Sequence, residues 1–422
     1  MTPQDPTTAG SGTTTTSVTS ATPTSADSST AAVIIGGGFG GYYAAHELAR
    51  HHVPVTLIEQ NGCQTFQPLL YQSATGLIDP ADLKFDYSQM KGVNTVAERV
   101  TAVDLASRMV QLAEGGTIKA DHLVLATGST VNFFGVPGAE EHALPLYTGP
   151  DAHAIKRRLQ ELVEGGSALR VVVVGAGATG VEITGAISDV VNDLLPRTYP
   201  QFQSTNADLH LVDHGSAPLA SMAVEGQKFA ATTLESVGVT LHMNRAVTAV
   251  AADSVALDDG TTLPADLVIW AGGLTANNPQ LTPDPQRTRG NRIVVGPDLR
   301  IPGYDNVYAI GDNSADADKS LPQLGSVAKQ QGHHVGSNIH RQISGREPKP
   351  FHYRDMGDMA MVRHDAAVVE MGQRHHPVTG TIAFGMWLGL HAYLLPGDRH
   401  RLDALHTWAH ELASGKSYYF AD

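Results

Sequence analysis

The chain contains the same glycine-rich turn twice, and this repeat limits the folds that are open to it. The stretches AAVIIGGGFGGYYAAHELA (31–49) and RVVVVGAGATGVEITG (170–185) each join an apolar run, three glycines in GxGxxG spacing and a helix-forming segment. In this arrangement a buried strand leads through a tight turn into a helix, whose N-terminus binds the pyrophosphate of a dinucleotide. The sequence therefore predicts an α/β fold with two Rossmann-like dinucleotide-binding domains.

The first unit has its glycines at Gly36, Gly38 and Gly41, and a second apolar run, 53–58, ends at Glu59. The first glycine permits the turn, the second lets backbone N–H groups approach the pyrophosphate, and the third lets the helix pack on the strand. An acid at the end of the second strand can accept hydrogen bonds from a ribose. GxGxxG alone is a weak signal, but the whole order favours a dinucleotide site over a purely structural turn.

The second unit has glycines at the three corresponding positions, Gly175, Gly177 and Gly180. Its next apolar run, 209–212, ends at Asp213, and the longer separation predicts an extended helix and loop between the turn and this strand. A carboxylate at this place favours a free 2′-hydroxyl and repels a 2′-phosphate. We therefore expect NADH rather than NADPH, unless His214 and nearby cations compensate.

Two dinucleotides in one chain indicate a flavin that accepts hydride from a nicotinamide, because two nicotinamides would have no redox partner. Two further segments support FAD as the second nucleotide. HLVLATGS (122–129) is an apolar run that ends in a small-residue turn with Thr127 and Gly128. NVYAIGDNS (306–314) ends in Gly311 and Asp312, and this aspartate can bind the ribityl hydroxyls of FAD or cap a helix, two compatible roles.

Composition excludes several other classes of function. The formal net charge of −14 argues against nucleic-acid partners, which require clustered Lys and Arg. The single cysteine, Cys63, allows neither an intrachain disulfide nor a cysteine metal cage, which favours a reducing, cytoplasmic location. Residues 1–30 consist mostly of Thr, Ser, Ala, Pro and Gly and are expected to form a disordered tail without the features of a secretory signal.

Histidines do not combine into a predicted metal site. His333 and His334 are adjacent, so they cannot converge on one ion from a helix. His406 and His410 have i,i+4 spacing, but they have no evident third ligand nearby and no HExxH motif. We therefore predict that no metal is bound.

Four segments, one of which is the second glycine turn, resemble a known family. They are FQPLLYQSATGLIDPADL (66–83), GAGATGVEITG (175–185), WAGGLTANNP (270–279) and LPQLGSVAKQQG (321–332). Over about residues 31–420, the chain resembles type II NADH dehydrogenases. These are single-subunit, non-proton-pumping NADH:quinone oxidoreductases of the pyridine nucleotide-disulfide oxidoreductase superfamily. Members of that superfamily that work through a CxxxxC pair or several cysteines are excluded by the single Cys63.

The resemblance implies where the two half-reactions take place. The nicotinamide would stack on the flavin beneath the turn that contains Glu182 and the loop formed by Gly272 and Gly273. Glu182 would then be a catalytic residue, although a carboxylate at a helix N-terminus is also favoured by the helix dipole. The quinone would enter near Gln330, the second expected catalytic residue, and Gln331. Adjacent helical residues point about 100° apart, so only one of these glutamines is expected to reach the site.

One motif departs from the family pattern and leaves two functions open. The family has AQxAxQ at its quinone site, where this chain has GSVAKQ: Ala328 and Gln330 match, whereas Gly325 and Ser326 do not. The first function is a peripheral respiratory enzyme that passes electrons from NADH to a membrane quinone. The alternative is a soluble NADH-dependent flavoenzyme that reduces a water-soluble quinoid or another small acceptor. Gln72 is a further candidate for lining the acceptor cavity.

The motifs also predict a domain order. The FAD domain should be discontinuous, from residues 31–150 and 271–350, with the NADH domain, 151–270, inserted. Residues 351–422 would form a C-terminal cap. A predicted helix in this cap carries one apolar stripe: Leu402, Leu405, Trp408 and Leu412. This stripe suits docking on the inner face of the cell membrane, packing on the body of the protein, or a homodimer contact.

Overall fold

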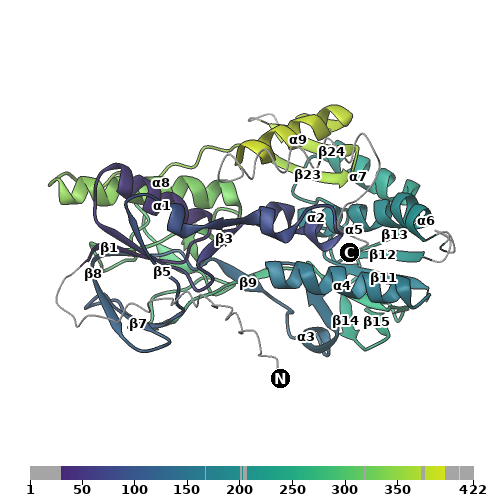
Figure 1. The fold of residues 1–422 in the computed structure, drawn as a ribbon, viewed down its shortest axis with the longest axis horizontal. Helices are drawn as coiled ribbons and strands as arrows, with labels where there is room; N and C mark the ends of the chain where they lie inside the picture. The colour runs from purple at the N-terminus through teal and green to yellow at the C-terminus, as the bar shows by residue number, and fades with distance from the viewer. Residues whose placement is uncertain are drawn as a thin grey trace, which may run out of the picture.

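The computed structural model describes residues 30–166, 168–199, 202, 207–317, 320–371, 376–394 and 408. These residues form two lobes, each with a sheet and flanking helices, and a small cap over one of them (Figure 1). The expected tail and most of the expected C-terminal helix lie outside the described residues. The predicted α/β class is confirmed, because both lobes are organised around parallel strands.

The first lobe contains an eight-stranded sheet in the order β19-β6-β7-β8-β1-β2-β5, with β21 also paired to β8. Its strands are β1 (Thr30–Ile35), β2 (Val55–Ile58), β5 (Val93–Val96), β6 (Val100–Asp104), β7 (Met109–Leu112), β8 (Thr117–Leu125), β19 (Gln280–Thr282) and β21 (Val307–Ala309). Strand β1 is parallel to both β2 and β8, and its residues Ala32–Ile35 are buried, which explains their unbroken apolar run.

Two helices cover one face of this sheet: α1 (Phe39–Arg50) and α8 (Gly325–Ile343). They pack so closely that a Cβ on Gly332 would lie 2.2 Å from the carbonyl oxygen of Gly40. Glycine is therefore required for this approach, which places the N-terminal end of α8 beside the first glycine turn.

The second lobe contains a five-stranded parallel sheet in the order β10-β17-β11-β12-β13. Its strands are β10 (Ala143–Pro145), β11 (Leu169–Val174), β12 (Ala207–Asp213), β13 (Val239–Met243) and β17 (Leu267–Trp270). The flanking helices are α4 (Gly149–Glu164), α5 (Ala178–Asp189) and α7 (Val224–Ser236). A π-helical turn, Val190–Leu194, and α6 (Leu195–Thr198) prolong α5, and they account for much of the long separation between the second turn and β12.

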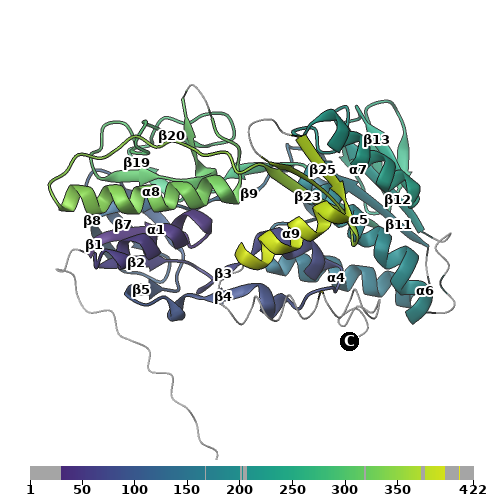
Figure 2. The same ribbon diagram turned by 90° about the horizontal axis from the view of Figure 1, so that it is seen from above.

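The lobes are joined by an antiparallel pair, β9 (Ser129–Val131) and β18 (Leu274–Ala276), which lies between them in both views (Figures 1 and 2). The remaining described elements are short: α2 (Leu70–Ala74), α3 (Ala139–His142), β3 (Cys63–Thr65), β4 (Lys84–Asp86), β14 (Val247–Val250), β15 (Ser254–Leu257), β16 (Thr262–Pro264), β20 (Ile293–Val295), β22 (Ser314–Asp316) and single 3-10 turns at Gln67–Leu69, Pro80–Leu83, Tyr87–Gln89 and Gly311–Asn313.

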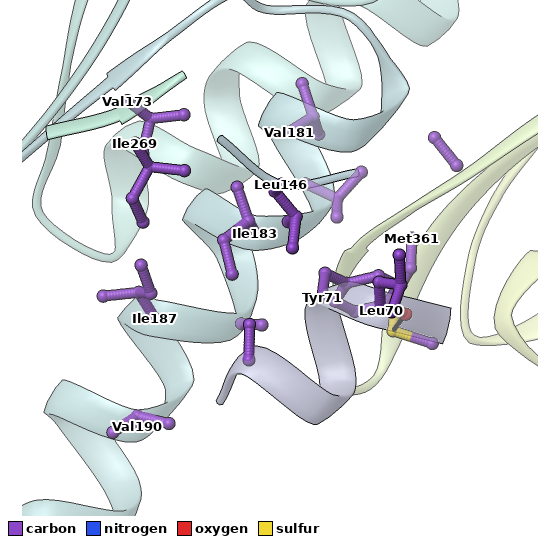
Figure 3. Close-up of a cluster of buried hydrophobic side chains, with 14 of the residues drawn as sticks. Leu70, Tyr71, Leu146, Val173, Val181, Ile183, Ile187, Val190, Ile269 and Met361 are labelled. Carbon is purple, nitrogen blue, oxygen red and sulfur yellow. Dashed lines mark hydrogen bonds between the residues drawn. The ribbon is translucent and has the colours of Figure 1, made fainter. Parts of the chain in front are cut away.

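The cap contains the antiparallel strands β23 (Asp358–Arg363), β24 (Ala366–Met371) and β25 (His376–Gly380), followed by α9 (Thr381–Leu394). Helix α9 packs against the cap strands β24 and β25, on the side of the second lobe (Figure 1). One hydrophobic core is shared by α2, the second lobe and the cap, so Tyr71 of α2 points toward Met361 of β23 (Figure 3). Within the described part of the chain, no helix has both the length and the apolar character needed to cross a bilayer.

Candidate active site

The first glycine turn has the shape that a pyrophosphate requires. Gly36 has φ +96°, and a Cβ there would lie 2.3 Å from the carbonyl oxygen of Ala126. A Cβ on Gly41 would lie 1.8 Å from the Gly36 carbonyl oxygen, so the helix could not pack on the strand with any larger residue. Above Gly38, by contrast, no atom lies within 4 Å of a Cβ position. This turn therefore has open space at the one position where backbone must approach a ligand.

The acid that follows β2 lies against this turn. The carboxylate of Glu59 accepts hydrogen bonds from the N–H of Gly37 at 2.8 Å and from the N–H of Asn61 at 3.2 Å. It is therefore held beside the helix N-terminus, where the ribose of a bound dinucleotide would lie. Sequence reasoning missed Tyr87, whose buried hydroxyl donates to the Gly37 carbonyl and closes the other side of the turn.

The loop after β21 contacts α8. Gly311 has φ +76°, and its N–H donates to Oε1 of Gln331 at 2.6 Å. Asp312 accepts a hydrogen bond from Ser129 Oγ at 2.8 Å. The Ser129 Oγ also lies 2.7 Å from Tyr147 Oη. Burial raises the pKa of Asp312, and the Ser129 hydrogen bond opposes this shift. A half-buried carboxylate with a hydroxyl partner fits the ribityl chain of FAD, which offers further hydroxyl donors.

The other predicted residues of the first lobe lie beside this loop. Asn313 donates from Nδ2 to Thr127 Oγ1 at 3.1 Å, and its own Oδ1 is buried without a partner among the described residues. Gly128 has φ +66°. The structure therefore brings together all the residues predicted to bind FAD along one edge of the first sheet, where the strands β1, β8 and β21 end.

The second glycine turn repeats this geometry. Gly175 has φ +102°, and a Cβ there would lie 2.5 Å from the Ala271 carbonyl oxygen and 2.7 Å from Cα of Gly272. A Cβ on Gly180 would lie 1.7 Å from the Gly175 carbonyl oxygen, whereas no atom lies within 4 Å of a Cβ on Gly177. The loop of Gly272 and Gly273, which was predicted to border the nicotinamide, therefore begins directly beside the second glycine turn.

Asp213 and the Gly273 loop border this second cradle. Asp213 accepts hydrogen bonds from the N–H groups of Ala176 and Gly215, both at 2.6 Å. Gly273 follows Gly272 and lies against Phe134, whose ring is 62% exposed. Both cradles thus combine a closed turn, open space and a strand-end acid, and these residues fit two dinucleotides.

Glu182 lies on α5 where the helix meets the cap. A Cβ on Gly185 would lie 1.8 Å from the Val362 carbonyl oxygen, so β23 crosses α5 in direct contact. As a result, the N–H of Met361 donates to Oε1 of Glu182 at 3.2 Å. Burial raises the pKa of Glu182 to about 8, although the Met361 N–H and the Trp387 side chain oppose the shift. This carboxyl group is therefore protonated at neutral pH.

The Trp387 side chain of the cap reaches this acid and belongs to an aromatic group that sequence reasoning did not predict. Trp387 is fully buried and stacks on His391 with ring centroids 3.9 Å apart. His391 donates from Nδ1 to the Trp387 carbonyl at 2.9 Å, and burial lowers its pKa to about 4. Tyr71 donates to Met361 Sδ at 3.0 Å, so α2 is attached to β23, the strand whose Met361 N–H binds Glu182.

Gln72, the weaker acceptor-site candidate, belongs to this aromatic group. Its Nε2 donates to Tyr71 Oη at 3.0 Å, and its Oε1 accepts from Nε1 of Trp408 at 3.0 Å. Trp408, the one described residue of the expected C-terminal stripe, is buried. Its indole therefore packs on the body of the protein.

The two adjacent glutamines of α8 point in different directions, as helical geometry requires. Gln331 is buried and binds Gly311, whereas Gln330 exchanges two hydrogen bonds with the backbone of Arg354, at 2.9 and 3.0 Å. Gln331 is thus the glutamine at the loop predicted to hold the flavin. The role of Gln330 at an acceptor stays a prediction.

The departures from AQxAxQ have local explanations. A Cβ on Gly325 would lie 3.3 Å from the ring of Phe39, closer than most Cβ contacts, so glycine accommodates this aromatic residue. Ser326 Oγ lies 3.2 Å from Tyr353 Oη, within hydrogen-bond distance. A phenol therefore lies next to the position where the family has a glutamine amide.

Among the described residues, a single group has metal-ligand spacing: Asp189, Asp193 and His364. Arg363 occupies these carboxylates, with Nε 2.7 Å from Asp189 and Nη2 3.5 Å from Asp193. The group therefore forms an ion-pair network, and the sequence-based prediction that no metal is bound is kept.

Comparisons with known proteins agree with this geometry. The family model described as pyridine nucleotide-disulphide oxidoreductase matches residues 30–332. The type II NADH:quinone oxidoreductase Ndh of Mycobacterium tuberculosis is 32% identical over 397 residues, covering 86% of this chain and 84% of the relative. The demethylphylloquinone reductase NdbB of Synechocystis is 26% identical, covering 87% and 89%.

A solved structure, NDH2 from Plasmodium falciparum in complex with NADH, has a TM-score of 0.85 at 18% identity, covering 93% of this chain and 99% of that one. At this identity the likeness shows the fold alone, whereas the family model and the mycobacterial relative establish kinship. The chain belongs to the pyridine nucleotide-disulphide oxidoreductase family and, within it, to the type II NADH:quinone oxidoreductases.

Proposed function

We propose that this protein oxidises NADH through bound FAD and passes the two electrons to a quinone. The observation that carries the proposal is the pair of matched cradles, at Gly38 and Gly177, each bordered by a strand-end acid. We assign the first cradle to FAD and the second to NADH, with domain boundaries near residues 150 and 271 and a cap from about residue 351.

The two lobes supply binding and orientation. When bound, FAD accepts hydride from NADH and returns two electrons to the acceptor. Glu59, Thr127, Gly128 and Asp312 hold one nucleotide; Asp213, Gly272 and Gly273 hold the other. Because most of the rate gain in hydride transfer comes from orientation and exclusion of water, positioning is the main contribution of these residues.

We assign Glu182 the role of a proton-holding residue at the site. Its side chain is half-buried where α5 meets the cap, and its carboxyl group keeps its proton at neutral pH, because desolvation raises its pKa to about 8. Quinone reduction consumes two protons as well as two electrons, so a protonated acid at the site can supply one of them. Gln330 is the second proposed contact with the acceptor, once its hydrogen bonds to Arg354 are exchanged.

We propose further that the cap docks on a lipid surface, from the cytoplasmic side. Large apolar side chains of the cap are exposed: Ile382 by 74%, Tyr393 by 69% and Met371 by 56%. Because the protein carries a net charge of −14, docking should depend on apolar contact rather than on attraction to anionic lipid. Flotation with neutral phosphatidylcholine vesicles tests this, and Ile382→Ser should reduce the bound fraction. Concentration-dependent dimers that Ile382→Ser abolishes, without flotation, would instead assign the surface to a second copy.

A soluble quinoid is the alternative acceptor. The contact between Ser326 and Tyr353 favours it, because this pair replaces a family glutamine at the expected quinone site. Anaerobic stopped-flow titration with NADH, followed by mixing with a quinone that lacks a lipid tail, tests the main proposal. We expect fast bleaching of the flavin absorbance and fast recovery with the quinone. Fast bleaching with slow recovery would refute the quinone as acceptor, and a flavin that NADH does not bleach would refute the whole proposal.

A further inference from the structure

A cation lies at the edge of the second sheet where the adenosine ribose would bind. Strand β13 runs parallel to β12, and the chain just beyond it stays hydrogen-bonded to the loop after β12. The N–H of Arg245 donates to the Asp213 carbonyl at 3.0 Å, and the N–H of Asn244 donates to the Gly215 carbonyl at 2.8 Å. The backbone of Arg245 is therefore adjacent to Asp213, the acid assigned to the ribose.

By itself, this arginine would favour NADPH over the expected NADH. A guanidinium beside the ribose is the group that accommodates the 2′-phosphate of NADPH, through charge-assisted hydrogen bonds. In the structure, however, Nε of Arg245 donates to Oδ2 of Asp259 at 2.6 Å, and its Nη1 donates to the Asn244 carbonyl at 2.9 Å. The guanidinium is thus engaged by a carboxylate from a different part of the lobe.

Asp259 is positioned for this contact by its own turn. It lies between β15 and β16, where Gly260 has φ +87° and the N–H of Thr261 donates to Oδ1 of Asp259 at 2.9 Å. One carboxylate oxygen is therefore fixed by the turn, while the other faces Arg245. The N–H of Asp258 donates to the Ala246 carbonyl at 3.0 Å, so this turn is also attached to the chain directly after the arginine.

We propose that Asp259 is a selectivity residue, which excludes NADPH by holding the Arg245 guanidinium away from the ribose 2′-position. This inference rests on the proposed function, because it requires NADH in the second cradle. An exposed ion pair is weak, and both side chains are partly exposed. A 2′-phosphate that displaced the guanidinium would nevertheless leave the Asp259 carboxylate unpaired beside a second anion. Asp213 repels the phosphate directly, and Asp259 withholds the cation that would offset this repulsion.

The two acids should therefore act together in a double-mutant cycle. Flavin reduction by NADH and by NADPH is measured by stopped flow for the wild type, Asp213→Asn, Asp259→Asn and the double variant. We expect the NADPH-to-NADH ratio of kcat/KM to rise about tenfold in Asp213→Asn and about threefold in Asp259→Asn. In the double variant it should rise at least about 100-fold, more than the product of the single effects. Asparagine preserves the size of the side chain and an acceptor oxygen, which limits disturbance of the turns.

The chain offers a matched control in Asp258, an exposed aspartate directly beside Asp259. Asp258→Asn removes the same charge but does not release Arg245, so it should leave the ratio unchanged alone and with Asp213→Asn. Adding Arg245→Ala to the double variant should abolish the gain. Binding of adenosine 2′,5′-bisphosphate, measured by calorimetry, should follow the same order without depending on turnover.

Equal effects of Asp258→Asn and Asp259→Asn, or a gain that survives Arg245→Ala, would overturn the inference and leave NADH oxidation intact. Strictly multiplicative single effects would also overturn it. A wild-type flavin that neither nucleotide reduces would refute the proposed function instead. The two failures can therefore be distinguished in one set of measurements.

Discussion

The two glycine turns have nearly the same backbone, although they hold different sequences and lie in different lobes. In each, the N–H of the first glycine donates at 2.8 Å to the last or next-to-last carbonyl of the strand on one side, β2 or β12. On the other side, the residue that follows β8 or β17 donates its N–H to the carbonyl of the residue just before the glycine, at 2.8 or 2.7 Å. These four hydrogen bonds are Gly36 to Ile58, Gly175 to Val212, Ala126 to Ile35, and Ala271 to Val174. The turn itself is thus dictated by the glycines and by strand order, and it does not distinguish one dinucleotide from the other.

The elements that surround the two turns differ. At the first turn, Gly37 contacts Tyr87, and the Gly311 loop is held by Gln331 of α8. At the second turn, Ala176 replaces Gly37, and the cap contacts α5 at Glu182. The comparison teaches that a common turn is surrounded by different elements in the two lobes: an extra loop and helix in one, and a cap in the other.

The largest effects are expected when a side chain fills the open space of one cradle and leaves the other unchanged. Gly38→Val should abolish bound flavin, with at least about tenfold lower absorbance at the flavin maximum, because the side chain would occupy the space for the pyrophosphate. Gly177→Val should keep its flavin but reduce it with NADH at least about 100-fold more slowly, because the nicotinamide would no longer be positioned.

Both positions have open space around a Cβ, so the apo forms should unfold at the wild-type temperature. Differential scanning fluorimetry of apoproteins provides this control. A yellow, FAD-replete Gly38→Val protein would show that the first cradle does not hold the flavin. Loss of flavin in Gly177→Val would show that the turns are not independent.

The next effect concerns the acid found at one turn only. Because the pKa of Glu182 is raised to about 8, reoxidation of the reduced flavin by quinone should slow above pH 8, about tenfold per pH unit. Glu182→Gln should be slower at neutral pH and lack this pH dependence, while reduction by NADH stays fast. A wild-type profile that is flat from pH 6 to 10 would remove Glu182 from the proton path.

A smaller effect is expected at Gln331, the α8 residue that binds the Gly311 loop near the first turn. Gln331→Ala removes the acceptor of the Gly311 N–H and leaves a buried donor unpaired, so FAD should dissociate about tenfold more readily, measured by ultrafiltration and absorbance. Gln330→Ala is the matched control, since its amide binds the Arg354 backbone instead. Equal flavin loss in both variants would contradict the assignment.

The smallest effect concerns acid stability of the cap. The pKa of His391 in the folded protein is about 4, against an ordinary value of 6.5, so the folded state binds fewer protons than the unfolded chain in this window. Stability should therefore fall as the pH falls from 6.5 to 4, by at most about 3 kcal/mol. His391→Phe should weaken this dependence in thermal unfolding scans. An undiminished pH dependence in the variant would place its origin elsewhere.

Motifs with a fixed local geometry were predictable from the sequence. Gly36, Gly175 and the strand-end acids lie as expected, because their spacing alone determines a strand, a turn and a helix. The contacts of Glu182 were not predictable, since they depend on Gly185 allowing β23 to cross α5 from residues that are distant in sequence. The same holds for Tyr87 and Gln331, whose positions follow from tertiary packing rather than from a local pattern. Periodicity predicted that two adjacent glutamines diverge, but not which of them faces Gly311.

The ribbon formed by β9 and β18 has a mechanical consequence. The chain leaves the first lobe along β9 and returns along β18, and the two crossings are hydrogen-bonded to each other. Two paired strands cannot slide along each other without breaking these bonds, whereas they can bend together as a hinge. The pairing thus opposes shear between the lobes at this joint, while bending of the ribbon stays possible. Such a joint would preserve the alignment of electron donor and acceptor through every cycle of nucleotide exchange.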